Sequence, residues 1–117
     1  MLGMEAAMAR GPAEVVTKHF VIVTDPRAER GLNHDLIEMI FLALTATLCG
    51  AQCWVDVERF VRSKLSWFLQ FVTLEHGVPS HDTFGRVFSR LDTGEFLSAM
   101  FAWVDEFAGN LRGRQEQ

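Results

Sequence analysis

The sequence predicts an all-α fold, a compact bundle of about five helices with a helix-turn-helix-like centre. Three observations support this class: apolar residues recur at intervals of three and four, Gly and Pro divide the chain into segments of helical length, and no pair of alternating strands is present. The 117 residues suffice for one domain with one core, and their composition, 49% hydrophobic and 22% charged, is that of a globular protein.

The N-terminal part of the chain predicts a short helix followed by a loop. Residues 1–11 are expected to be disordered, and a helix is expected over residues 12–23, with Pro in its first turn. The β-branched run HFVIV at the end of this helix leaves a strand as the alternative. The stretch TDPRAERGLN, residues 24–33, is predicted to be a loop because Asp-Pro disfavours a helix.

The middle of the chain predicts the central core helix and a second helical stretch. Residues 34–49, HDLIEMIFLALTATLC, are apolar on nearly every face, and Gly50 stands at the C-cap position. Acidic residues at both ends, without basic anchors, favour a buried helix over a membrane span. Residues 54–72 continue at helical spacing, and a break near Ser63, which could cap a further helix, is the alternative to one continuous helix.

The stretch VPSHDTFGRVFSRL, residues 78–91, predicts a capped amphipathic helix that follows a turn. Ser80 is placed to accept a hydrogen bond from the amide of Thr83 as the N-cap, and Asp82 in the first turn suits the helix dipole. The apolar residues fall on one stripe of this helix, at Phe84, Val87, Phe88 and Leu91.

Two arginines of this helix, Arg86 and Arg90, fall opposite the apolar stripe and are expected to face solvent. A helix that presents Thr and Arg outward after a tight turn is typical of the DNA-reading element of a helix-turn-helix. The alternative is that Asp82 and Arg86 form a surface ion pair worth about 0.2–0.5 kcal/mol and that Arg90 only solvates the surface. The net charge of −4 restricts any nucleic-acid contact to a local patch.

The C-terminal segment predicts one more helix and a polar tail. Asp92 followed by Glu95 has the spacing of a capping box, and apolar residues recur at helical spacing over residues 96–111. Residues 112–117 are expected to form a polar, frayed tail. The three tryptophans fall within helical stripes, so core packing is expected of Trp54, Trp67 and Trp103.

No cofactor, metal or small-molecule site is expected. Cys49 and Cys53 are expected to be buried free thiols, because structural zinc takes four ligands in close-set pairs and no second pair stands at such a spacing. His19 and His34 are expected to be packed or capping residues. The acidic residues are scattered, and no Gly-rich phosphate loop occurs. The start of the chain does not resemble a signal peptide, so a cytoplasmic protein is expected.

The string GVPSHDTFGRVFSRLD, with HF…DPR upstream and LCGAQCW in the middle, resembles the N-terminal transposase-associated domain of H-repeat-type insertion-sequence transposases. The resemblance covers roughly residues 15–110. The matching positions are Asp25, Pro26, Arg27, Gly50, Trp54, Gly77, Pro79, Ser80, His81, Asp82, Thr83, Phe84, Arg86, Phe88, Leu91 and Phe96. The resemblance implies a helical domain, residues 12–111, that in the family precedes an RNase-H-like domain whose Asp-Asp-Glu carboxylates hold divalent metal.

The resemblance implies a role in transposition in which this chain is not itself an enzyme. The chain ends at Gln117, before the catalytic domain, and lacks that domain's Asp-Gly-Lys opening, so we expect the accessory domain alone, truncated or excised. DNA at transposon ends is the expected partner. The candidate contacts are Ser80, His81, Thr83, Arg86 and Arg90. The alternative is a protein-interaction or dimerisation module that docks on the catalytic domain or on another copy, which a large exposed apolar patch would favour.

Overall fold

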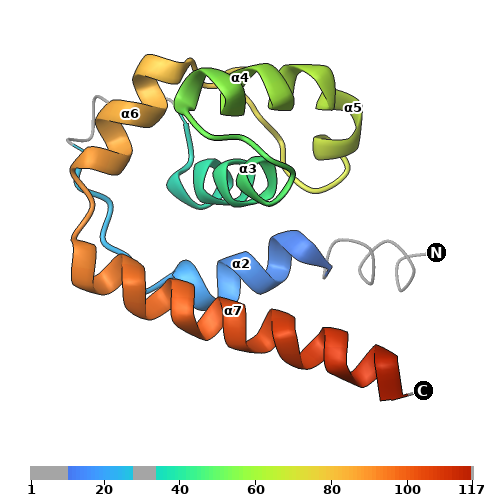
Figure 1. The fold of residues 1–117 in the computed structure, drawn as a ribbon. Helices are drawn as coiled ribbons and strands as arrows, with labels where there is room; N and C mark the ends of the chain where they lie inside the picture. The colour runs from blue at the N-terminus through green and yellow to red at the C-terminus, as the bar shows by residue number, and fades with distance from the viewer. Residues whose placement is uncertain (1–10, 28–33, 117) are drawn as a thin grey trace.

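The computed structural model describes residues 11–27 and 34–116, and this part of the chain contains six α-helices and no strand. The all-α prediction is therefore confirmed. The helices are α2 (Pro12–Phe20), α3 (Leu36–Leu48), α4 (Trp54–Ser63), α5 (Leu65–Phe68), α6 (His81–Ser89) and α7 (Thr93–Glu116). Helices α3 to α6 form one group, and α2 and α7 lie side by side beneath it (Figure 1). Residues 1–10 of the predicted disordered start, which ran to residue 11, and residues 28–33 of the predicted loop lie outside the described residues.

Helix α3 is the centre of the core, as its apolar sequence predicted. The Asp35 side chain caps its start by accepting a hydrogen bond from the amide of Glu38, and Gly50 follows its end with a φ of 108° that favours glycine. Its buried residues lie on nearly every face of the helix, at Leu36, Met39, Ile40, Phe41, Leu42, Ala43 and Ala46. Among the described helices, none combines the length and apolar character needed to cross a bilayer.

Helix α2 links the core to the last helix of the chain. It packs on both α3 and α7, and the strand alternative for HFVIV is wrong because residues 19 and 20 complete α2 and residues 21–23 form a turn. Phe20 is fully buried, and its ring lies 5.5 Å from that of Phe96 in α7. Glu106 of α7 accepts a hydrogen bond of 2.9 Å from Lys18 and lies 2.8 Å from Nε2 of His19. These bonds lower the pKa of Glu106 below its ordinary value.

Helix α7 differs from the prediction at both ends. Asp92 caps it as predicted, because its carboxylate accepts a hydrogen bond of 2.9 Å from the amide of Glu95. The carboxylate of Glu95 does not close a capping box; it binds the amide and hydroxyl of Thr24 instead. Residues 112–116, predicted as a frayed tail, continue α7 to Glu116.

The predicted break in residues 54–72 is present, but Ser63 does not cap the next helix. The hydroxyl of Ser63 donates to the carbonyl of Phe60, and Lys64 separates α4 from α5. Residues 69–80 then connect α5 to α6, whereas a helix-turn-helix uses a turn of about three or four residues. The predicted helix-turn-helix-like centre is therefore not confirmed: a turn at Gly77 does precede α6, but a longer connection separates α6 from α5, and α6 packs on α4.

Candidate functional site

Helix α6 is built as its sequence predicted. The hydroxyl oxygen of Ser80 accepts a hydrogen bond of 3.2 Å from the amide of Thr83, which confirms the N-cap. Phe84 and Val87 are buried, and Phe88 is half-buried. The apolar stripe therefore fixes one side of α6 to the core and leaves the opposite side to solvent.

Trp54, the first residue of α4, positions α6. Its ring lies parallel to that of Phe84, with centroids 5.6 Å apart, and 4.9 Å from the ring of Phe88. Gly85 lies against this ring, and a Cβ at this position would be 3.4 Å from Cδ1 of Trp54, at the edge of ordinary van der Waals contact. The tryptophan therefore orients the outer side of α6 as well as filling space in the core.

The outer side of α6 carries two exposed arginines, Arg86 and Arg90, one turn apart, as predicted. Nη2 of Arg86 lies 3.4 Å from the hydroxyl of Thr83, to which it donates. Among the described residues no ion pair joins Arg86 to Asp82, whose carboxylate lies 3.6 Å from Nε2 of His81 instead. The surface ion pair considered as an alternative is therefore wrong, and both guanidinium groups are available to a ligand.

The N-terminus of α6 is occupied by the carboxylate of Glu58 from α4. The amide of His81 donates to Oε1 of Glu58 at 2.7 Å, and Nδ1 of His81 lies 2.9 Å from the same oxygen. Oε2 accepts a hydrogen bond of 2.9 Å from Nε of Arg62. The hydrogen bonds from His81, followed by that from Arg62, lower the pKa of Glu58 to about 2.

Positive charge on α6 is therefore concentrated in its C-terminal half. Glu58 and Asp82 balance the helix dipole at the start, whereas Arg86 and Arg90 lie toward the end. The role of Glu58 was not predicted, and no local pattern in the sequence indicates it, because 23 positions separate Glu58 from His81.

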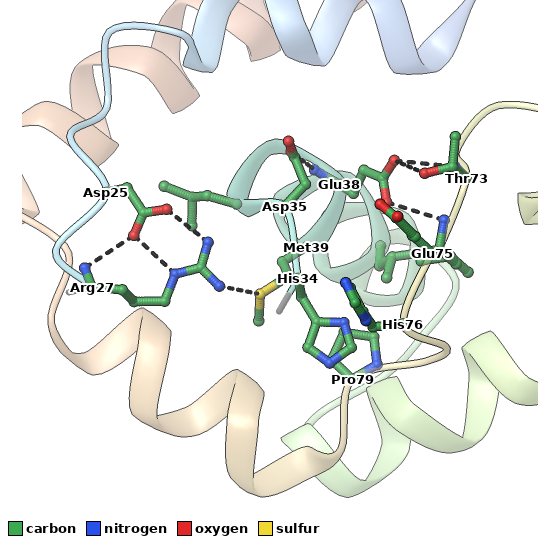
Figure 2. Close-up of a pocket in the computed structure, with 13 residues that line it drawn as sticks. Asp25, Arg27, His34, Asp35, Glu38, Met39, Thr73, Glu75, His76 and Pro79 are labelled. Atoms are coloured by element: carbon green, nitrogen blue, oxygen red, sulfur yellow. Dashed lines mark hydrogen bonds and ion pairs between the residues drawn. The ribbon is translucent and has the colours of Figure 1, made fainter. Parts of the chain in front are cut away.

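A pocket of about 340 Å³ lies between the loop before α3, the start of α3 and the loop before α6 (Figure 2). Asp25 and Arg27 of the family-like motif form an ion pair at its edge, with Nη2 of Arg27 2.6 Å from Oδ2 of Asp25. Hydrogen bonding from Arg27 lowers the pKa of Asp25. Nη1 of Arg27 also lies 4.0 Å from the sulfur of Met39. The motif therefore ties the loop to α3.

Glu38 ties the opposite wall of this pocket to α3. Its carboxylate accepts hydrogen bonds from the amide and hydroxyl of Thr73, at 3.1 and 3.0 Å, and from the amide of Leu74, at 3.2 Å (Figure 2). Leu74 is buried with a φ of 46°, a left-handed conformation that is uncommon for a leucine. The carboxylate thus stabilises a strained turn.

The remaining polar groups of the pocket include two histidines. The rings of His34 and His76 meet edge to face, with centroids 6.4 Å apart. Burial, followed by the charges of His76 and Arg27, lowers the pKa of His34. Most carboxylates around the pocket already cap helices or hold loops, so the arrangement serves the architecture. Within residues 11–27 and 34–116, no group of three His, Cys, Asp or Glu side chains is placed to hold a metal ion.

The two cysteines are free, as expected, but the prediction that they are buried is wrong. Cys49 ends α3 and Cys53 precedes α4, and both side chains are exposed. The turn between them carries Gly50, and the positive φ of 84° at Gly77 marks a second turn ahead of Pro79, which is buried. The remaining residues of the family-like motif are thus turn or packing positions.

Comparison with known proteins places the chain among transposase-related sequences. Residues 17–104 match the family model described as DDE_Tnp_1-associated. An uncharacterized protein in the dhlA 3′ region of Xanthobacter autotrophicus is 45% identical over 86 residues, which are 73% of this chain and 29% of that protein. The H repeat-associated putative transposase YhhI of Escherichia coli K12 is 31% identical over 87 residues, 74% of this chain and 23% of the relative.

A shorter relative is also similar. The inactive transposase YbfQ of Escherichia coli K12 is 34% identical over 73 residues, which are 62% of this chain and 87% of that protein. The chain therefore spans less than a third of the Xanthobacter protein and of YhhI, and most of YbfQ. No solved structure matches the chain.

Proposed function

The chain belongs to the DDE_Tnp_1-associated family, and on that basis we propose that it is a non-catalytic N-terminal domain of an insertion-sequence transposase that contacts the DNA of transposon ends in the cytoplasm. YhhI, a relative of this chain, is named as a putative transposase, and a transposase acts on DNA. The part that this domain plays is inferred from its own surface.

The observation that carries the proposal is the pair of exposed arginines on α6. Arg86 and Arg90 lie one turn apart on the side opposite buried Phe84, so they can approach a groove or a backbone without disturbing the core. Arginine offers donors that suit both guanine edges and phosphates. A pair at this spacing supports a local DNA contact on a chain that is acidic overall.

The other candidate residues have supporting roles in the proposal. Ser80 caps the start of the helix, and its side chain together with that of Thr83 forms a polar surface next to Arg86. His81 holds Glu58 at the start of α6, so in the proposal it orients the helix and lies at the edge of the DNA contact. The acidic groups at this end repel phosphates, and affinity is expected to be weak and to depend strongly on salt.

Binding of duplexes that carry the terminal inverted repeats of a relative's element, measured by fluorescence anisotropy at low salt, tests the proposal. An arginine on a guanine edge would cost about 1–3 kcal/mol when changed to alanine and would relax the sequence preference. One on a phosphate would weaken all sequences alike and reduce the salt slope by about one. Arg59→Ala, which removes an exposed arginine from α4, is the matched control.

Two results would contradict the proposal. The first is a double variant, Arg86→Glu with Arg90→Glu, that melts like the parent and binds element ends equally well. The second concerns catalysis: we expect no strand cleavage by this chain with magnesium or manganese, so metal-dependent nicking of a donor duplex by the purified chain would overturn the non-catalytic role.

A protein-interaction module is the second candidate function. The observation that favours it is the exposed apolar surface of α7, where Phe101 is 70% exposed. A DNA contact through α6 and a protein contact through α7 use different helices, so the two functions are compatible.

A further inference from the structure

Charge on the outer side of α6 is ordered along the helix. Asp82, Arg86 and Arg90 recur at intervals of four residues, so they share this side, with the acid in the first turn and the arginines after it. The Asp82 side chain is 83% exposed, and Glu58 of α4 places a second carboxylate at the same end, where it accepts a hydrogen bond from the amide of His81. The start of α6 is therefore negative, and its C-terminal half is positive.

This order of charge disfavours insertion of α6 into a major groove. A helix-turn-helix places the N-terminal residues of its recognition helix against base edges. The major groove is about 12 Å wide and lies between two phosphate strands, so a helix about 10–12 Å across fills it. Inserted in this way, α6 would bring the carboxylates of Glu58 and Asp82 between two rows of negative phosphates. The start of α6 is therefore expected to lie away from the DNA.

The hydroxyl groups on α6 and at its cap are already bound within the helix. The hydroxyl oxygen of Ser80 accepts a hydrogen bond from the amide of Thr83 and lies 3.1 Å from the Thr83 hydroxyl. That hydroxyl in turn accepts a hydrogen bond of 3.4 Å from Arg86, and the hydroxyl of Ser89 donates to the carbonyl of Arg86 at 2.9 Å. Reading of base edges needs side-chain donors and acceptors that can turn toward the bases. The guanidinium groups of Arg86 and Arg90 are thus the principal groups of this side that can reach DNA.

Given the DNA-contacting function proposed for this helix, we propose that Arg86 and Arg90 bind neighbouring phosphates of one DNA strand and that α6 reads no base sequence. The four positions between the two arginines correspond to about 6 Å along the helix axis. Successive phosphates of one strand advance about 3.4 Å along the duplex axis and are further apart along the winding strand, so each long side chain can reach one of them. Such a contact holds duplex DNA in place and leaves recognition of the end sequence to other contacts.

The number of phosphate contacts sets the expected strength of binding. Each phosphate neutralised on duplex DNA contributes about −0.9 to the slope of log K against log salt concentration, so two contacts give a slope of about −1.8. Non-specific binding to DNA typically has a dissociation constant of roughly 10⁻⁴ to 10⁻⁶ M at physiological salt. With two contacts on a chain of net charge −4, we expect a dissociation constant of about 10⁻⁴ M or weaker under those conditions, and tighter binding as the salt is lowered.

Fluorescence anisotropy with two labelled duplexes tests the proposal. One duplex carries the terminal inverted repeat of a relative's element, and the other carries a scrambled sequence of the same length and composition. We expect the dissociation constants on the two duplexes to agree within about twofold at each of several low salt concentrations, because phosphates carry no sequence information. Arg86→Ala and Arg90→Ala should each weaken binding to both duplexes alike and reduce the salt slope by about 0.9. Circular dichroism melts check that each variant folds.

Substitution by lysine separates phosphate binding from base reading. Lysine keeps the point charge that a phosphate contact needs but lacks the planar fork with which arginine binds two acceptors of one base. Arg86→Lys and Arg90→Lys should therefore keep a salt slope near −1.8 and bind both duplexes within about threefold of the parent. Asp82→Asn removes a repelling carboxylate and should tighten binding to both duplexes alike. Asp105→Asn is the matched control with a smaller expected effect, because it changes the net charge equally but lies about 18 Å along α7 from its start.

Two results would overturn the phosphate contact and leave the proposed DNA-contacting function standing. One is a preference of more than about tenfold for the terminal repeat that either lysine variant abolishes, because this is the behaviour of arginine on a guanine edge. The other is an Asp82→Asn variant that loses affinity for the terminal repeat alone, because the carboxylate would then accept from a base amino group. Failure of the parent chain to bind either duplex at any salt concentration would instead overturn the proposed function, and the phosphate contact with it.

Discussion

Replacement of Trp54 by alanine should loosen α6 from α4 while leaving every charge of the candidate DNA contact in place. The indole lies parallel to the Phe84 ring at 5.6 Å and 4.9 Å from the Phe88 ring, and it is largely enclosed. No helix is present in residues 69–80, which connect α5 to α6, and α6 packs on α4. The aromatic contact of Trp54 is therefore a principal attachment of α6 to α4. The variant therefore separates the position of α6 from its chemistry.

The expected cost of Trp54→Ala is about 3 kcal/mol in the free energy of unfolding. Fully buried tryptophans cost about 3–5 kcal/mol on truncation to alanine, and the partial exposure of Trp54 places it at the lower end. Each aromatic contact contributes about 0.5–1.5 kcal/mol of this beyond area burial. Trp54→Phe keeps a ring over Phe84 and should cost about half as much.

Urea unfolding followed by circular dichroism measures the total cost, and amide hydrogen exchange locates it. Exchange should accelerate in α6 more than in α3, because α6 would open locally before the whole domain unfolds. Trp67→Ala is the control: Trp67 of α5 stacks on Phe41 of α3, away from α6, so its loss should leave α6 protection unchanged relative to the core. A loss below about 1 kcal/mol for Trp54→Ala, or uniform acceleration in all helices, would refute the reasoning.

Three further substitutions test other contacts. Glu38→Ala should destabilise the fold by about 2 kcal/mol in urea unfolding, because it removes the three hydrogen bonds that hold Thr73 and the strained Leu74. The same change at exposed Glu75 should cost under about 0.5 kcal/mol. The folded state lowers the pKa of Glu58 from 4.5 to about 2, so the contacts of its carboxylate stabilise the fold fully above pH 4.5. This contribution to the free energy of unfolding is lost as the pH falls toward 2. Glu58→Gln should therefore reduce the loss of stability in acid, measured by unfolding at a series of pH values. Gly85→Ala should raise the free energy of unfolding by up to about 1 kcal/mol, because alanine favours the helix and its Cβ would lie 3.4 Å from the indole of Trp54. A lower melting temperature in thermal melts would show that this contact is too tight.

Local signals predicted most of the helices but not how they meet. The apolar run of α3, the Ser80 cap and the Asp92 cap depend on residues within a few positions of one another, and all three were predicted. Contacts across long separations were not. Glu95 has the spacing of a capping box, yet its carboxylate binds Thr24, because tertiary packing brings a competing donor within 2.9 Å.

The candidate site shows the same division. Periodicity predicted that Arg86 and Arg90 face solvent, and this is confirmed. It could not reveal that Glu58 occupies the start of α6, because periodicity places residues on a helix face and does not say which helices pack together across 23 positions. The predicted burial of the cysteines failed for a related reason: both stand at helix ends, where the chain turns outward although the neighbouring sequence is apolar.

The pairing of α2 with α7 has a consequence for how the domain is made. The ribosome releases α2 first, but Glu106 of α7, which binds Lys18 and His19 of α2, lies 88 and 87 positions after them. Until α7 emerges, Phe20 lacks the ring of Phe96 that covers it in the finished domain. Closure of the domain is therefore a late step of synthesis, and a nascent chain stalled before residue 93 should expose an aromatic surface that chaperones recognise.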